Sequence, residues 1–264
     1  MNRTVKVGMP QMALGCLSEN WLLKELGDLH WDTLCSSLKS TSRDLVDSQG
    51  RRLYATFVRI RIDLDGTLRD FGEGDEISFC AEMMRFGRST VQSTIAIQGP
   101  KSSGTASLLT TFSVRTRADS NALLKSEPMG DYHDIEAASD ISPFFKEYSA
   151  VRAEFGRYTG HPQPGPEDTY QINPFVDSNG ANLLYFAAYQ SISDLLTLRS
   201  HPEETNVSTS SRDIYFFRNT DLGDTVYRLP VARILRGSGS VDSAHLLIRS
   251  DGQCLAYVNT VKEP

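Results

Sequence analysis

The sequence predicts an α+β fold made of two similar units in tandem, each an antiparallel sheet wrapped around one long apolar helix. Three observations predict it. A helix-forming pattern with its preceding loop occurs twice, β-branched and aromatic segments follow each copy, and the composition is that of an ordinary globular protein, with 39% hydrophobic and 23% charged residues. The 264 residues are enough for two small domains, which we expect to span residues 1–135 and 136–264.

The first long helix is expected over residues 18–39 and its counterpart over residues 181–198. Each segment is preceded by a proline and a short polar loop with glycine, and an asparagine, Asn20 or Asn182, stands near its start. Apolar residues then recur at the spacing of one helix face: Leu22, Leu23, Leu26 and Leu29 in the first segment, and Leu183, Leu184, Ala187, Ala188 and Ile192 in the second. Both helices are therefore predicted to be buried, with side chains of the loop capping their first turns.

Four strands are predicted after each helix, in matching order. Their residues are β-branched or aromatic, and turn residues separate them. The first set covers residues 54–62, 76–86, 89–98 and 106–115, and the second covers residues 211–218, 225–235, 240–249 and 254–261. The pairs Gly74-Asp75 and Gly223-Asp224 stand directly before the second strand of each set, so they align the two copies.

One helix wrapped by a curved antiparallel sheet is the hot-dog arrangement, and two copies in one chain make a pseudo-dimer, a double hot-dog. The sheets of the two copies can pair edge to edge, which protects strand edges that would otherwise be exposed. The connection between the units is expected in the polar residues 119–151. Residues 161–166 contain three prolines and a glycine, so an extended or turn-like conformation is expected there.

Charge, hydropathy and cysteine use exclude several classes of protein. The 27 basic and 33 acidic residues give 27 − 33 = −6 and form no long basic run, which argues against nucleic acid as a partner. No apolar stretch approaches the ~20 residues that cross a membrane, and residues 1–11 lack the apolar region of a secretory signal. The four cysteines are scattered and no histidines have metal-ligand spacing, so we expect free thiols, no metal and a cytoplasmic protein.

The loops before the two long helices are candidate substrate-binding sites, because motifs for nucleotide binding, zinc proteases and serine hydrolases are absent from the sequence. The start of a helix offers free N–H groups and the positive end of the helix dipole, which suit a thioester carbonyl or an enolate oxygen. The candidates are Glu19, Asn20, Asn179, Gly180 and Asn182; Gly180 would let a ligand approach the backbone. Helix capping by the same side chains is the structural alternative.

Three stretches carry a resemblance to a known family. They are Gly8-Met-Pro with Gly15-Cys-Leu-Ser-Glu-Asn-Trp-Leu-Leu-Lys-Glu-Leu-Gly-Asp-Leu-His-Trp31, then Leu53-Tyr-Ala-Thr-Phe-Val-Arg-Ile-Arg61, and Ile172-Asn-Pro-Phe-Val-Asp-Ser-Asn-Gly-Ala-Asn-Leu-Leu-Tyr-Phe-Ala187. They resemble the double hot-dog bifunctional acyltransferase/decarboxylases of polyketide biosynthesis, and the similarity spans nearly the whole chain.

The resemblance implies a reaction and its partners. An enzyme of this kind takes malonyl or methylmalonyl from coenzyme A (CoA), decarboxylates it and loads acetyl or propionyl on an acyl carrier protein. The implied partners are therefore a malonyl-type CoA thioester and the carrier protein with its phosphopantetheine arm, without a bound cofactor. A homodimer is compatible with this expectation.

The resemblance also implies one working tyrosine on the first strand after the first helix, and Tyr54 is at that position. Taken alone, a tyrosine in a strand is more often a packing residue. A phenol is a poor nucleophile unless its anion is stabilised, so Tyr54 is expected either to carry the acyl group or to donate a proton to the thioester oxygen. By regular alternation Arg59 and Arg61 share one face of this strand with Phe57, and they are expected either to be exposed or to meet the phosphates of CoA.

Two other functions fit the same fold. A hot-dog thioesterase would need a carboxylate such as Asp177 or Glu19 to activate water, and a non-catalytic protein would only bind acyl-CoA or acyl carrier protein. A dehydratase is disfavoured because neither loop contains a histidine. His30 lies about 15 Å along the helix from Asn20, at ~1.5 Å per residue, and we expect it to be structural.

Overall fold

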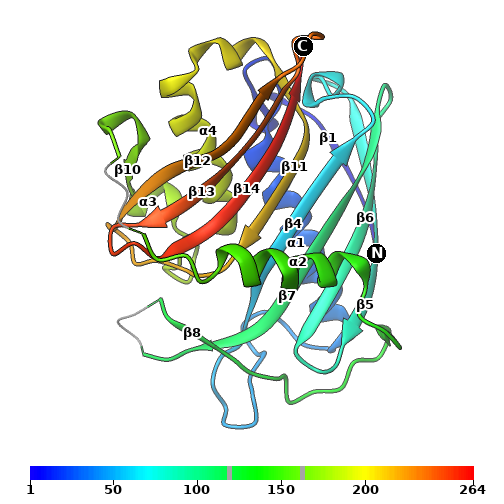
Figure 1. The fold of residues 1–264 in the computed structure, drawn as a ribbon. Coiled ribbons are helices and arrows are strands. Elements are labelled where there is room, and N and C mark those ends of the chain that lie inside the picture. Colours follow the sequence, from blue (N-terminus) through cyan, green and yellow to red (C-terminus); the bar gives the residue numbers. More distant parts are fainter. Residues whose placement is uncertain (118–120, 161–163) are drawn as a thin grey trace.

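The computed structural model describes residues 1–117, 121–160 and 164–264. A twelve-stranded, almost entirely antiparallel sheet curves around two long helices, α1 (Glu19–Ser37) and α4 (Phe186–Ser200) (Figure 1). The main strand order is β1-β5-β6-β7-β4-β11-β14-β13-β12-β10, so the second half of the sheet repeats the connections of the first half. This is the predicted pair of helix-wrapped sheets.

The strands of the first unit are β1 (Asn2–Lys6), β4 (Tyr54–Leu64), β5 (Glu76–Phe86), β6 (Thr90–Gln98) and β7 (Ser103–Arg115). Those of the second unit are β10 (Thr169–Gln171), β11 (Ser208–Phe216), β12 (Thr225–Leu235), β13 (Val241–Arg249) and β14 (Cys254–Glu263). The short strands β8 (Leu123–Lys125) and β9 (Glu136–Ala137) extend the sheet, and β2 (Met12–Ala13) pairs with β3 (Cys16–Leu17). The other helices are α2 (Pro143–Phe155), α3 (Pro174–Asp177), η1 (Met9–Gln11), η2 (Leu68–Asp70), η3 (Pro166–Asp168) and η4 (Pro202–Asn206).

The eight predicted strands are confirmed, with ends displaced by at most three residues. The predicted alignment of the two copies is confirmed as well. Gly74 and Gly223 both adopt positive φ angles, 88° and 93°, in the turns before β5 and β12. A residue without a Cβ adopts this conformation without strain, which explains glycine at both places.

Helix α1 begins and packs as its sequence predicts. The Ser18 hydroxyl accepts a hydrogen bond from Trp21 N at 3.3 Å and caps the first turn. At Gly27 the helix passes so close to the start of α4 that an added Cβ would lie 2.5 Å from the Phe186 ring. Glycine at this position therefore sets how closely the two central helices approach.

Helix α4 begins at Phe186, five residues after the predicted start at Ala181, so that prediction is wrong. The Asn179 side chain holds the preceding residues in a turn by accepting hydrogen bonds from Ala181 N and Leu183 N. Within this turn Asn182 has a φ of 55°, which is outside the helical region. The apolar spacing continues into the turn, and this is why periodicity alone extended the helix.

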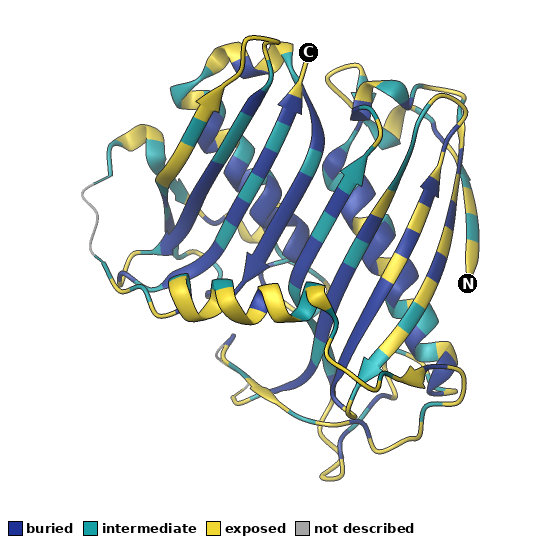
Figure 2. Ribbon diagram, turned by 45° about the vertical axis from the view of Figure 1, so that its right-hand side comes forward, coloured by how far each residue is buried: buried dark blue, intermediate teal, exposed yellow. Residues whose placement is uncertain are grey.

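Helix α2 corrects the expectation of a polar connection over residues 119–151. It lies across the outer face of the sheet and spans the junction of the two units (Figure 2). Arg59 of β4 is fully buried beneath it, 4.0 Å from the Phe144 ring centroid, and donates to Asp213 of β11 at 2.6 Å. Tyr148 is the only buried residue of α2, so its sequence carries too weak an apolar pattern to predict a helix. Residues 119 and 120, and residues 161–163 of the proline-rich stretch, lie outside the described residues.

The two units form one continuous sheet, because β4 pairs with β11 and places Ile60 opposite Ile214. The domain boundary expected between residues 135 and 136 stays a prediction. Directly after that position, β9 pairs with β5 of the first unit. No described helix is both long and apolar enough to span a membrane. All four cysteines are free.

His30 joins α1 to the sheet and is structural, as expected. Its ring nitrogens hydrogen-bond with Ser93 at 2.7 Å and Thr110 at 2.9 Å, and burial lowers its pKa to about 3. The second unit has the same type of bond with the partners exchanged, because Ser193 of α4 meets His245 of β13 at 2.9 Å. A buried imidazole thus ties each central helix to its own sheet.

We predict that His30→Gln removes a specific part of the acid sensitivity of the fold. Since the unfolded chain protonates His30 near pH 6.5 and the folded chain only near pH 3, stability falls as the pH drops below 6.5. Between pH 7 and pH 5 this residue should lower the free energy of unfolding by ~2 kcal/mol. Urea unfolding at both pH values should show that loss in the wild type and in the exposed-site control His133→Gln, but not in His30→Gln. An unchanged pH dependence in His30→Gln would contradict the assignment.

Candidate functional site

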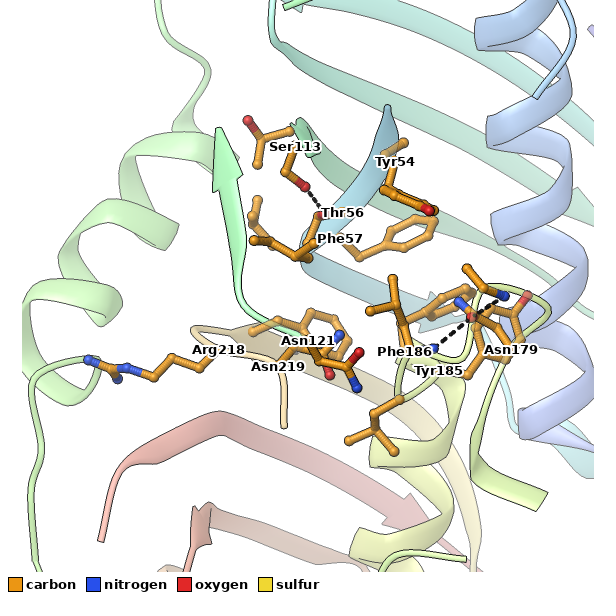
Figure 3. Close-up of a pocket in the computed structure, with 18 of the residues that line it drawn as sticks. Tyr54, Thr56, Phe57, Ser113, Asn121, Asn179, Tyr185, Phe186, Arg218 and Asn219 are labelled. Carbon is orange, nitrogen blue, oxygen red and sulfur yellow. Dashed lines mark hydrogen bonds between the residues drawn. The ribbon is translucent and has the colours of Figure 1, made fainter. Parts of the chain in front are cut away.

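The cavity that we consider the functional site lies where the two units separate. Residues 59–63 of β4 pair with residues 211–215 of β11. Beyond Arg59 the strands part, and β4 continues to Tyr54 paired only with β7. A cavity of about 890 Å³ occupies the opening (Figure 3), within the size range of small-molecule sites.

The cavity reaches from the helix side of the sheet to the α2 side. On the helix side it is lined by Gly27, Asp28 and Trp31 of α1 and by residues 179–181 and 183–186 before and at the start of α4. On the α2 side it is lined by Phe145, Tyr148 and Arg152. Residues 54–58 of β4 and 216–221 at and after the end of β11 form the walls in between. Both units therefore contribute to a single site.

Tyr54, the first residue of β4, is half-buried in the wall of this cavity. The guanidinium carbon of Arg52 lies 5.3 Å from its ring centroid. Among the described residues, the Tyr54 hydroxyl has no hydrogen-bond partner. In Figure 3 Tyr54 and Asn179 approach the cavity from different walls, one from each unit. The tyrosine hydroxyl is thus available to a ligand.

Asn179 presents an amide donor to the same cavity. Its Oδ1 accepts hydrogen bonds from Ala181 N at 2.9 Å and Leu183 N at 3.1 Å, which fixes the orientation of the amide. No protein acceptor for Nδ2 occurs in the described part of the chain. The position of a Cβ on the neighbouring Gly180 has no atom within 4 Å. A ligand oxygen can therefore approach both the amide and the backbone.

Of the candidates from the sequence, Tyr54, Asn179 and Gly180 line the cavity, whereas Glu19, Asn20 and Asn182 do not. Asn20 donates to Ala187 O at 3.0 Å and to Ser191 Oγ at 2.9 Å, so its amide joins α1 to α4. Asn182 is exposed on the turn before α4. The loop before the second long helix therefore reaches the cavity, and the loop before the first does not.

The start of α1 is instead filled by a buried ionic network at the opposite end of the β4–β11 junction. Arg212 of β11 donates from Nε to Glu19 Oε1 at 2.6 Å and also pairs with Asp194 of α4 at 2.9 Å. Lys262 extends the network to Glu204 at 3.1 Å. Burial alone would raise the pKa of Asp194, but the charges of Arg212 and Lys262 hold it well below its usual range. Glu19 is thus a structural ion-pair partner in this structure.

Asp177 also has structural partners. Its Oδ2 accepts hydrogen bonds from the Tyr170 hydroxyl at 2.9 Å and from Asn173 N at 2.8 Å, which fixes the short helix α3. The carboxylates that line the cavity are Asp28 and Asp221. Asp28 pairs with Arg3 at 2.9 Å, and Asp221 accepts from Asn121 N at 2.9 Å. No group of three possible metal ligands occurs within residues 1–117, 121–160 and 164–264.

The lining carries an excess of positive charge. Its basic side chains are Arg52, Lys125, Arg152, Arg218 and Arg249, and its acidic side chains are the two aspartates, so 5 − 2 = +3. This contrasts with −6 for the whole chain. A positive cavity in an acidic protein favours an anionic ligand. The five basic residues belong to five separate segments of the chain, so no local sequence pattern identifies them.

The arginines proposed from the sequence to meet phosphates do not lie in this cavity. A β-bulge between Phe57 and Arg59 places these two side chains on opposite faces of the sheet. Arg59 is committed to Asp213 beneath α2, and Arg61 donates to Asp63 at 2.7 Å. The regular alternation assumed for this strand is therefore wrong at the bulge.

Comparison with known proteins supports the architecture. No family model matches the sequence, and no curated protein matches it. Among solved structures, an acyl-ACP thioesterase from Bacteroides thetaiotaomicron is similar with a TM-score of 0.64 and 11% identity, over 100% of this chain and 97% of that chain. A 12:0-ACP thioesterase from Umbellularia californica is similar with a TM-score of 0.65 and 13% identity, again over 100% of this chain and 97% of that chain.

The chain has a hot-dog fold. The agreement over the full length of both chains includes both units, which confirms the double arrangement. Identities of 11% and 13% establish the fold and leave the reaction to be argued from the site.

We predict that Glu19→Gln destabilises the fold while leaving ligand binding in the cavity unchanged. The substitution leaves the buried Arg212 charge short of a partner, which should lower the free energy of unfolding by ~3 kcal/mol. Denaturant unfolding measures this loss. The control Glu25→Gln, in a more exposed pair with Arg3, should cost less than ~1 kcal/mol. Equal stability of Glu19→Gln and wild type would show that the network is not structural.

Proposed function

We propose that this chain is an enzyme that acts on acyl thioesters of CoA or of an acyl carrier protein, in the cavity between its two units. One observation carries the proposal. The Tyr54 hydroxyl and the Asn179 amide, both without protein partners in the described part of the chain, border one cavity whose lining has a charge of +3. A thioester carbonyl needs hydrogen-bond donors, and the phosphates of its carrier need positive charge.

The same two donors suit several reactions of a thioester. Attack on the carbonyl carbon and loss of carbon dioxide from a malonyl thioester both place negative charge on the thioester oxygen. A donor that is already held in place stabilises that charge without having to reorganise. Because Oδ1 of Asn179 is fixed by two backbone amides, its Nδ2 meets this requirement.

Decarboxylation with acyl transfer is one form of the proposal, and the sequence resemblance and Tyr54 favour it. When the malonyl carboxylate leaves as carbon dioxide, the electrons of the broken C–C bond form the enolate, which then takes up a proton. This step needs no strong base, which is consistent with two lining carboxylates that already have partners. Tyr54 would then accept the acyl group or protonate the oxygen before transfer to the thiol of the carrier.

Hydrolysis is the other form, and the two similar solved structures favour it more than transfer, because both are thioesterases. Water would add to the carbonyl carbon, and the thiol would leave with a proton. Asp28 or Asp221 would act as the base, since Asp177 is engaged in α3 and Glu19 lies at the opposite end of the β4–β11 junction.

One incubation distinguishes these forms. The chain is mixed with acetyl-CoA, malonyl-CoA or methylmalonyl-CoA and a holo acyl carrier protein, and the intact masses of the carrier and the small products are measured. Transfer with decarboxylation yields carrier with acetyl or propionyl, whereas hydrolysis yields free acid and CoA with an unmodified carrier. Binding without any product would overturn the proposal of an enzyme and leave a thioester-binding protein.

We predict that Tyr54→Phe lowers the rate of product formation by ~10²-fold or more, because it removes the one hydroxyl of this residue and keeps the ring. Product formation is measured by mass spectrometry and thermal stability by calorimetry. The melting temperature should stay close to that of the wild type, since the hydroxyl has no partner among the described residues. A variant with a normal rate would make Tyr54 a packing residue. Decarboxylation without transfer would identify the tyrosine as the acyl carrier.

We predict that Asn179→Asp and Asn179→Ala separate the catalytic donor from the structural acceptor. Aspartate keeps an oxygen for Ala181 N and Leu183 N but replaces Nδ2 with a negative oxygen, so the rate should fall by ~10²-fold with little loss of stability. Alanine should lose the same activity and also ~1–2 kcal/mol of stability. Rate and unfolding measurements on both variants test this. Full activity of the aspartate variant would contradict the role of Nδ2.

A further inference from the structure

The cavity contains an unpaired sheet edge. Residues 54–58 of β4 pair with β7 on one side, whereas the pairing with β11 ends at Arg59. All five of these residues line the cavity. Their backbone groups that point away from β7 have no hydrogen-bond partner among the described residues. Interior sheet edges are normally paired or covered, so this edge is open to a ligand that can pair with it.

Three arginines from different elements also line the cavity. Arg152 belongs to α2, Arg249 ends β13, and Arg218 follows β11. Arg218 donates to Gly156 O at 2.6 Å and to Cys254 O at 3.1 Å, which fixes its position between the end of α2 and the start of β14. Arg152 and Arg218 form what we call the basic mouth, on the α2 side. Arg249 instead pairs with Asp251 and, opposite Val226 in the sheet, lies on the helix side.

The polar side chains that line the cavity are arranged in order from one side of it to the other. In Figure 3 Arg218 lies at one side, Asn121 and Asn219 lie in the middle, and Tyr54 and Asn179 lie at the other side. A ligand that spans the cavity thus meets positive charge first, then amide groups and an unpaired strand edge, and finally the two donors assigned to the thioester.

We propose that the phosphopantetheine arm of CoA or of a carrier protein crosses the sheet through the gap between β4 and β11. Its phosphate lies at the basic mouth, its two amides pair with the backbone of residues 54–58, and its thioester lies at Tyr54 and Asn179. The inference rests on the proposed function for the position of the thioester. It adds the path of the arm, its direction and the groups that bind it.

The chemistry of the arm fits this path. Pantetheine is an extended chain with two secondary amides between a phosphate and a thiol, so its middle part resembles a peptide. An extended peptide binds an open strand edge through main-chain hydrogen bonds. The five residues of the edge span about 16 Å at ~3.3 Å per residue, which is long enough for both amides. The two donors assigned to the thioester, Tyr54 and Asn179, lie at the end of the cavity away from Arg218 of the basic mouth, and this gives the arm one direction.

Binding of CoA and of pantetheine tests the mouth. Arg152→Gln should weaken CoA binding about fivefold, the upper range for a partly exposed charge, as measured by titration calorimetry. Pantetheine, which lacks the phosphate, should show no such loss. Arg218 is not substituted, because it holds two backbone carbonyls. The matched control is Arg236→Gln, which removes an exposed arginine that pairs with Asp242 outside the cavity. Thermal melting of each variant confirms that it is folded.

Hydrogen–deuterium exchange tests the edge. CoA and a holo carrier protein should each slow amide exchange in residues 54–58, whereas an apo carrier, without the arm, should not. If only CoA slows amide exchange in residues 54–58, the site binds CoA. If only the holo carrier slows it, the site binds the arm of the carrier protein. CoA binding that protects other residues, or that is insensitive to Arg152→Gln, would overturn the path.

Turnover is measured on the same preparations, so the two proposals can fail separately. Turnover without protection of residues 54–58 would refute the path and leave the enzyme proposal standing. Protection and an arginine effect without turnover of any acyl thioester would refute the enzyme proposal and support the path. The absence of CoA and carrier binding together with the absence of turnover would refute both.

Discussion

The pairing of β4 with β11 is the interaction on which the remaining architecture depends. Five residues of each strand join two units that would otherwise each expose a sheet edge. The place where the pairing ends matters as much as the pairing. Beyond Arg59 the separated strands leave a gap in the sheet, and side chains from both units line the cavity in this gap.

Arg59 explains how the sheet can open at this point without coming apart. Its guanidinium lies between the Phe144 and Tyr215 rings and pairs with Asp213 across the junction. An arginine this deeply buried would be unfavourable without such partners, because desolvation of the charge must be compensated by hydrogen bonds and aromatic contacts. Helix α2 supplies part of this compensation and covers the last paired residues, so the connection between the units also reinforces their junction.

The sequence predicts the repeated elements because their physical signals are local. Leu22, Leu23, Leu26 and Leu29 identify α1 by spacing alone, and the glycines before β5 and β12 align the copies. The predictions fail where something other than apolar spacing decides the outcome, either a side chain folded onto its own turn or a contact with a distant element. The start of α4 depends on how Asn179 folds back on its own turn, α2 depends on a buried arginine from another element, and the basic side chains of the cavity come together only after folding. Tyr54 was found through a family resemblance, since nothing in the strand pattern distinguishes it from a packing tyrosine.

The ionic network around Arg212 has a consequence for how such a protein can change over time. In a symmetric dimer of identical subunits every substitution occurs twice, so a cluster that fills one helix start would fill both. A single chain with two non-identical halves removes this constraint. Glu19, Arg212 and Asp194 can stabilise one end of the junction while Asn179 and Gly180 keep the other end open, and each end can be selected for its own task without harm to the other.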